Sequence, residues 1–387
     1  MIGDSGVSVK QEPSSSRHAL GARLLVSVVS ALVTLGLVEA GLRLAMPDLS
    51  GVVFSPVTSE ESPFRFDPRI GYELKPYGVI GDERMNSDGF RGPERAVPKP
   101  SDVYRLLAIG DSVVEATIGD VRFEQSWAAR LERSLAAPRG AAGLRYEVIN
   151  AGVGGYVSWQ ALARLQTRGL KYQPDLVIVL VGWGDLLYGM EPRWYPTVSL
   201  TDVPDARAGQ TPWRAARRSV LRLSFVARLV HRLRTLRRPT RVEVARTAER
   251  RRAFNQAALE NYVANMEKIR DVVTGSGATL AVVAFPTLLT RGLLEELQRS
   301  DTGPTLGDYA DAIDRYRTAI RSLANRHSGV ILIDAAEAFA AKAPAEQERL
   351  FVDPVHLSPE GNELLADIVR ASLARTGKVF GSAPRGA

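Results

Sequence analysis

The sequence YRLLAIGDS, which runs from Tyr104 to Ser112, is a largely apolar segment that ends in a glycine, an aspartate and a serine. A short apolar run that stops at a turn-forming residue is typical of a buried β-strand. If this strand belongs to a parallel sheet, Ser112 lies at its carboxyl end, where α/β folds place their active sites. The segment therefore predicts both a fold class and a position for the chemistry.

Strand-like and helix-like segments alternate along the rest of the chain. Four further apolar runs predict strands at residues 146–151, 176–181, 279–285 and 330–333. Helices are predicted at residues 124–137, 158–170, 255–273, 306–327 and 359–374. Repeated alternation of this kind predicts a parallel sheet that is covered by helices on both faces. We therefore expect an α/β three-layer sandwich with a five-stranded parallel sheet.

Three polar residues near the predicted strand ends are of the types needed for nucleophilic catalysis. A serine hydroxyl is a weak nucleophile until a base accepts its proton, and His356 can be that base for Ser112. Asp353 precedes this histidine by three residues, so on a tight turn its carboxylate can fix the imidazole tautomer. Glycines at positions 152, 154 and 155 let the backbone approach a substrate and offer N–H groups to an oxyanion.

The order of these motifs resembles the SGNH/GDSL hydrolase superfamily over roughly residues 103–375. The Gly-Asp-Ser block of that superfamily corresponds to residues 110–112, and its second-block glycine corresponds best to Gly155. Its last block, Asp-x-x-His, corresponds to Asp353 and His356. The resemblance implies a flavodoxin-like fold and an acyl ester substrate, with ester hydrolysis or O-acyl transfer as the reaction and no cofactor or metal.

The resemblance also implies a role for each motif residue. The catalytic triad would be Ser112, Asp353 and His356, and the oxyanion donors would be Ser112, Gly155 and the third-block position, Gly184.

The third block departs from the pattern of the superfamily. It is usually Gly-x-Asn-Asp, whereas residues 182–185 read GWGD, so Gly184 replaces the asparagine that normally donates to the oxyanion. Loss of one oxyanion donor typically costs about 2.7–4 kcal/mol of barrier. Either another group donates instead, with Trp183 and Asn86 as candidates, or the enzyme is slow, or the fold serves as a non-catalytic binding module.

The N-terminal part of the chain divides into a polar tail and an apolar segment. Residues 1–17 are serine-rich and predict a disordered tail. Residues 24–38 carry no charge, and extension to 18–46 makes a segment long enough for a transmembrane signal anchor. A cleaved secretory signal peptide and a buried core helix are the alternatives. Basic residues precede the apolar run, which predicts a single-pass membrane protein with an extracytoplasmic catalytic domain.

The rest of the chain is organised around the hydrolase domain. Residues 47–102 are rich in proline and glycine and predict a loop-rich preface that packs on that domain. The domain is expected at 103–375, with a basic helical insertion at about 200–252, and residues 376–387 are expected to be a disordered tail.

The insertion carries most of the positive charge. Between Arg207 and Arg252 there are fifteen arginines and two acidic residues. Apolar residues at spacings of three and four within 219–238 predict a basic amphipathic helix. This helix either binds anionic lipid headgroups beside the anchor or is a solvated lid or partner-facing helix.

The composition excludes several kinds of site. The 387 residues include no cysteine, which excludes disulfides, thiolate metal sites and a cysteine nucleophile. The four histidines do not pair at metal-ligand spacing, so no metal is expected. Nucleic-acid binding is not expected, because the basic insertion has few aromatic residues and would lie outside the cytoplasm. The sequence therefore favours an esterase or O-acyl transferase that acts on an acylated glycan or lipid-linked substrate.

Overall fold

The computed structural model describes residues 15–45, 62–67, 69–136, 144–190, 254–289 and 305–377, and the single positions 224, 226 and 229. Most of the predicted tails, the start of the preface and most of the basic insertion lie outside the described residues. Contacts divide the chain into two units, one formed by residues 1–53 with 211–237 and the other by the remaining residues.

The first unit contains a long apolar helix, α1, from Ser15 to Ala45. Its segment Ala22–Ala45 has a mean hydropathy of 2.1 and is long and apolar enough to cross a membrane. None of the side chains of this segment is buried in the described structure, which does not support the alternative of a buried core helix. Near the helix end, Glu39 accepts hydrogen bonds from the Ser224 hydroxyl at 3.0 Å and the Val226 amide at 3.2 Å. The predicted apolar helix is therefore present, and its insertion into a membrane stays a prediction.

The second unit is built on the predicted five-stranded parallel sheet. Its strands are β5 (Val103–Gly110), β6 (Arg145–Asn150), β7 (Leu176–Leu180), β8 (Thr279–Val283) and β9 (Ile331–Ile333). They lie in the order β6–β5–β7–β8–β9, and each neighbouring pair is parallel. The chain places β6 on one side of β5 and then returns to place β7 on the other side. The carboxyl ends of β5 and β7 therefore form the topological switch point, where such sheets bind ligands.

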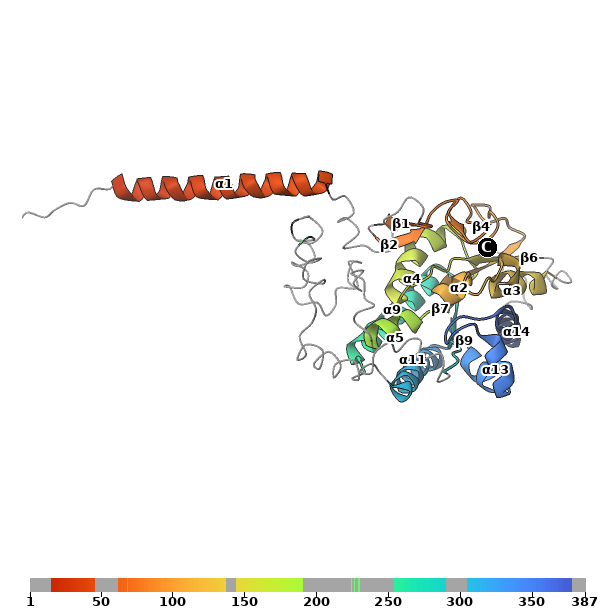
Figure 1. Cartoon of the computed structure of the whole chain (residues 1–387). Coiled ribbons are helices and arrows are strands. Elements are labelled where there is room, and N and C mark those ends of the chain that lie inside the picture. The colour runs from red at the N-terminus through yellow and green to blue at the C-terminus, as the bar shows by residue number, and fades with distance from the viewer. Residues whose placement is uncertain are drawn as a thin grey trace, which may run out of the picture. The chain divides into compact units, whose positions relative to one another are not determined.

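Helices cover both faces of the sheet and complete the three layers (Figure 1). On one face, α3 (Trp127–Leu135) packs against α14 (Pro359–Arg375). The opposite face carries α4 (Ser158–Arg164), α9 (Gln256–Gly275) and α11 (Leu306–Arg326). Because both faces are covered, all five residues of β7 are buried. The predicted fold class is confirmed.

Several short elements of the structure are not predicted by the spacing of apolar residues in the sequence. They are α2 (Ser112–Glu115), α5 (Trp183–Met190), α12 (Ala335–Ala340), α13 (Pro344–Leu350) and a 3₁₀ turn at Phe123–Gln125. The helix predicted at 158–170 is α4 followed by a π-helical turn, Leu165–Gly169, and a 3₁₀ turn, Leu170–Tyr172. Helices of one or two turns are unstable alone and form because the surrounding fold holds them.

The described part of the preface contains two small hairpins. They pair β1 (Phe64–Asp67) with β2 (Gly71–Leu74), and β3 (Val79–Ile80) with β4 (Glu83–Arg84). Both strand pairs are too short to be stable alone, so the hairpins depend on packing against the domain.

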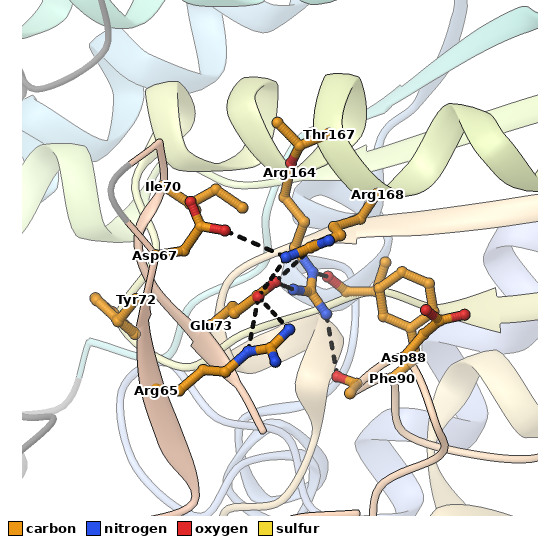
Figure 2. Close-up of polar contacts among 12 residues, drawn as sticks. Arg65, Asp67, Ile70, Tyr72, Glu73, Asp88, Phe90, Arg164, Thr167 and Arg168 are labelled. Carbon is orange, nitrogen blue, oxygen red and sulfur yellow. Dashed lines mark hydrogen bonds and ion pairs between the residues drawn. The ribbon is translucent and has the colours of Figure 1, made fainter. Parts of the chain in front are cut away.

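An ion-pair cluster joins the first hairpin to the helical segment after β6 (Figure 2). The buried carboxylate of Glu73 lies 2.6 Å from guanidinium nitrogens of Arg65 and Arg168, and 3.5 Å from one of Arg164. Arg164 also donates to the Gly89 carbonyl oxygen at 3.1 Å. A buried charge is stable only when it is paired in this way, so the cluster holds the preface in place.

Candidate active site

Ser112 begins helix α2 directly after the carboxyl end of β5. Asp111 caps this helix, because its Oδ1 accepts a hydrogen bond from the Val113 amide at 3.0 Å. The helix has four residues and is followed by Ala116, whose φ of 56° is left-handed. The strand and its sharp turn therefore present the serine at the switch point of the sheet.

The C-terminal loop brings the other two predicted catalytic residues to this serine. The Oγ of Ser112 lies 2.8 Å from Nε2 of His356, although 244 positions separate the two residues along the chain. On the other side of the ring, Nδ1 of His356 lies 2.5 Å from Oδ2 of Asp353. The structure thus joins the three residues in the hydrogen-bonded order serine, histidine, aspartate.

Asp353 is held by its own turn. Its Oδ1 accepts backbone N–H bonds from Val355 and His356, both at 2.8 Å. Burial alone raises the pKa of Asp353, but the hydrogen bond from the His356 ring and the backbone N–H bonds together outweigh burial and hold that pKa below its usual value. The carboxylate therefore stays ionised and fixes the orientation of the imidazole.

The predicted oxyanion donors lie on two segments that Glu115 connects. The Ser112 amide donates to no acceptor among the residues that the structure describes. Gly155 lies in the loop after β6, and its φ of 76° is left-handed, which favours glycine. Its neighbour Gly154 donates its N–H to the buried Glu115 carboxylate on α2. Glu115 therefore ties the loop of Gly155 to the helix of Ser112.

The third predicted position, Gly184, has no room for a side chain. A Cβ atom on this residue would lie 2.6 Å from the Tyr156 carbonyl oxygen, closer than side chains approach in real proteins. The adjacent Asp185 accounts for the close contact, because its carboxylate accepts the Ser158 amide at 2.8 Å and the Ser158 hydroxyl at 2.6 Å. These bonds draw α5 onto the start of α4, so only glycine fits at the contact.

The two candidate replacements for the missing asparagine differ in their surroundings. Asn86 lies in a turn of the preface, where its Oδ1 accepts the amides of Asp88 at 3.0 Å and Phe90 at 2.8 Å. Its Nδ2 donates to the Pro93 carbonyl oxygen at 3.4 Å. The structure therefore gives Asn86 a role in that turn and does not support it as a donor. Trp183 lies at the carboxyl edge of the sheet and packs edge-on against Phe285, and it stays a candidate.

Two buried carboxylates near the site are not singled out by the sequence. Asp111 and Asp185 are 3% and 2% exposed, and burial raises the pKa of each to about 7. Repulsion between the two carboxylates contributes to the shift at Asp185. Oδ2 of Asp111 has no hydrogen-bond partner in the described part of the chain. The signal that could have identified them is their position, since each directly follows a glycine of the first or third block.

No group of three histidine, aspartate or glutamate side chains among the described residues is placed to hold a metal ion.

The model of the GDSL-like Lipase/Acylhydrolase family matches residues 108–364 of the chain. The chain is also 38% identical to Esterase TesA of Pseudomonas aeruginosa over 87 residues, which are 22% of this chain and 40% of TesA. The match therefore spans less than half the length of that relative.

Two solved structures are similar to this chain at low sequence identity. The lipase/acylhydrolase from Enterococcus faecalis is 16% identical with a TM-score of 0.42, and the alignment covers 73% of this chain and 99% of that one. Esterase EstA from Pseudoalteromonas sp. is 14% identical with a TM-score of 0.41, and the alignment covers 70% and 98%.

Proposed function

This chain belongs to the GDSL-like Lipase/Acylhydrolase family, and we propose that it is a serine hydrolase that cleaves or transfers ester-linked acyl groups. Ser112 is the nucleophile, His356 the general base and Asp353 the residue that orients the base. The observation that carries the proposal is the pair of distances, 2.8 Å from serine to histidine and 2.5 Å from histidine to aspartate. The ionised state of Asp353 supports it further.

The reaction follows from this arrangement. Nε2 of His356 accepts the proton of Ser112 as Oγ attacks the ester carbonyl carbon, and Asp353 stabilises the imidazolium that forms. The N–H groups of Ser112 and Gly155 bind the oxygen that becomes negatively charged. The imidazolium then protonates the leaving alcohol, and the acyl group remains as an ester of Ser112 Oγ. His356 next accepts a proton from water or a second alcohol, which attacks this ester, breaks the acyl–Oγ bond and frees the serine. Water gives hydrolysis, and an alcohol gives acyl transfer.

We propose an acylated glycan or a lipid-linked molecule as the substrate. A cavity of about 940 Å³ lies between the β3–β4 hairpin and the residues 117–124 that follow α2, and the three triad residues are not among those that line it. Charged side chains of both signs line it, among them Asp82, Arg84, Asp120 and Arg122. Such a lining supplies hydrogen-bond donors and acceptors for a hydroxylated molecule, and the size is typical of ligand sites.

We further propose that α1 holds the enzyme at a membrane with the catalytic domain outside the cytoplasm. The apolar segment Ala22–Ala45 and the basic residues before it support this orientation. A reporter fused after residue 100 should be active outside the cytoplasm, and the chain should sediment with membranes. A cytoplasmic reporter signal would exclude the orientation, and a soluble mature protein would exclude the anchor.

A non-catalytic binding module is the second candidate, because Gly184 stands where the family pattern has a donor. Turnover of p-nitrophenyl acetate by the full-length chain separates the two candidates. We expect Ser112→Ala to lose at least about 10³-fold in kcat. Ser134→Ala, on helix α3, is the matched control and should retain the wild-type rate. If Ser112→Ala turns over the ester as fast as the wild type, Ser112 is not the nucleophile. A folded wild type that neither turns over the ester nor reacts with a fluorophosphonate would favour the binding module.

A further inference from the structure

One tyrosine of the preface reaches the predicted oxyanion loop. Tyr72 on β2 donates its hydroxyl hydrogen to the Gly154 carbonyl oxygen at 2.8 Å, although the two residues are 82 positions apart. In the opposite direction, Tyr156 donates its hydroxyl hydrogen to the Tyr72 carbonyl oxygen at 2.6 Å. Both side chains are buried, and their rings pack edge-on with centroids 5.3 Å apart. Figure 2 shows Tyr72 on the same strand as Glu73 and its ion pairs.

The bond from Tyr72 acts on a peptide group that matters for catalysis. The Gly154 carbonyl belongs to the peptide that joins Gly154 to Gly155. A peptide is planar and trans, so its carbonyl and its N–H point in opposite directions within one plane. A hydroxyl that holds the carbonyl oxygen therefore also sets the direction of the Gly155 N–H. Two successive glycines place little restriction of their own on that plane, so it depends on outside contacts.

A second contact holds Gly154 from the side of the nucleophile. Its N–H donates to the Glu115 carboxylate on α2. The carbonyl oxygens of Glu115 and Ala116 in turn accept hydrogen bonds from the buried guanidinium of Arg91 at 2.9 and 2.5 Å. The preface therefore contacts both sides of the predicted oxyanion site, through Tyr72 on the glycine loop and through Arg91 on the nucleophile helix.

We infer that Tyr72 is a positioning residue for the oxyanion site. Its hydroxyl orients the Gly154–Gly155 peptide so that the Gly155 N–H points at the oxygen that becomes negatively charged during attack by Ser112. The inference rests on the proposed function and adds to it a role for the preface in the reaction rate. The preface is then part of the catalytic machinery as well as a clasp on the domain.

The test is Tyr72→Phe in the full-length chain, because this change removes one hydroxyl and keeps the ring that packs on Tyr156. Removal of an oxyanion donor costs about 10²–10³-fold in kcat, and here the donor remains but is less well oriented, so we expect a loss of about tenfold. The KM for p-nitrophenyl acetate should not change, because Tyr72 acts through the peptide and only in the transition state. The labelling rate with a fluorophosphonate, whose phosphoryl oxygen occupies the oxyanion position, should fall by a similar factor.

Tyr156→Phe is the matched control. It removes the other hydroxyl of the same tyrosine pair, whose partner is the Tyr72 carbonyl and not the Gly154–Gly155 peptide. We expect both variants to unfold at lower urea concentration than the wild type, and we expect Tyr156→Phe to keep kcat within about twofold.

The outcomes separate the inference from the function on which it rests. A wild-type kcat in Tyr72→Phe, together with an inactive Ser112→Ala, would overturn the inference and leave the hydrolase function in place. If Tyr72→Phe and Tyr156→Phe lose kcat equally, both losses come from general packing, and this result would also overturn the inference. Wild-type activity in Ser112→Ala would instead reject the function itself.

Discussion

We expect Gly184→Asn to slow the enzyme, although the family resemblance by itself predicts the reverse. An asparagine restores the amide that the third block usually supplies. One additional oxyanion donor typically raises kcat by roughly tenfold or more. In the structure a side chain at position 184 would collide with the Tyr156 backbone, so this gain in rate is not expected.

The size of the effect follows from the contact. A Cβ on Gly184 would lie 2.6 Å from the Tyr156 carbonyl oxygen, whereas ordinary contacts begin at 3.4 Å, so the two segments must separate by the difference, about 0.8 Å. The bonds from Ser158 to Asp185 oppose this separation. Overpacking of this kind costs about 1–3 kcal/mol of stability. Because Tyr156 follows Gly155 directly, a shift of the loop by nearly 1 Å should lower kcat by about 10–10²-fold.

The assay compares wild type, Gly184→Ala and Gly184→Asn by urea unfolding and by kcat on p-nitrophenyl acetate. Gly184→Ala adds the Cβ without the amide, so it measures the packing cost alone. We expect both variants to be less stable than the wild type, and the asparagine variant to be no faster than the alanine variant. An asparagine variant that exceeds the wild-type rate would contradict this expectation, because the loop must then have moved and the amide must reach the oxyanion.

Three further changes test other parts of the site. Arg91→Ala removes the guanidinium that holds α2, and kcat should fall at least about tenfold at unchanged KM. Arg145→Ala removes an exposed ion pair with Asp102 at the start of β6 and should keep kcat. Asp353→Asn should lower kcat by about 10³–10⁴-fold in a folded protein, and a loss under about tenfold would contradict its role. Asp185→Asn should flatten the pH dependence of stability. Burial raises the pKa of Asp185 to about 7. The folded state therefore keeps a proton that the unfolded chain loses above about pH 4. The wild-type free energy of unfolding should therefore fall as pH rises from about 4 through 7, and an equal slope in the variant would contradict the assignment.

The sheet was predictable from the sequence because its strands are covered on both faces. A strand of this kind must be apolar on both sides, so the run predicted at 176–181 becomes β7, Leu176–Leu180. The β1–β2 hairpin was not predicted, since four-residue strands among prolines and glycines give little alternation to detect. It forms because the buried side chains of Glu73 and Tyr72 find partners on distant segments.

Part of the candidate site was likewise predictable from the sequence, and part was not. Motif order predicts that Ser112, Asp353 and His356 meet, because strand ends of a parallel sheet lie at one edge. The bonds from Tyr72 and Arg91 carry no such signal, because they join backbone carbonyls whose positions no sequence spacing defines. The departure in the third block appears in the sequence as a missing asparagine, and in the structure it is a contact too close for any side chain.

Covalent labelling tests the central claim most directly. The full-length chain is treated with a fluorophosphonate, digested, and mapped by peptide mass spectrometry, beside His356→Ala treated in the same way. We expect one adduct, on Ser112, and a labelling rate that falls by at least about 10²-fold when His356 is replaced, because the base that activates the serine is then absent. An adduct on another serine, or undiminished labelling of Ser112 in His356→Ala, would contradict the proposed catalytic triad.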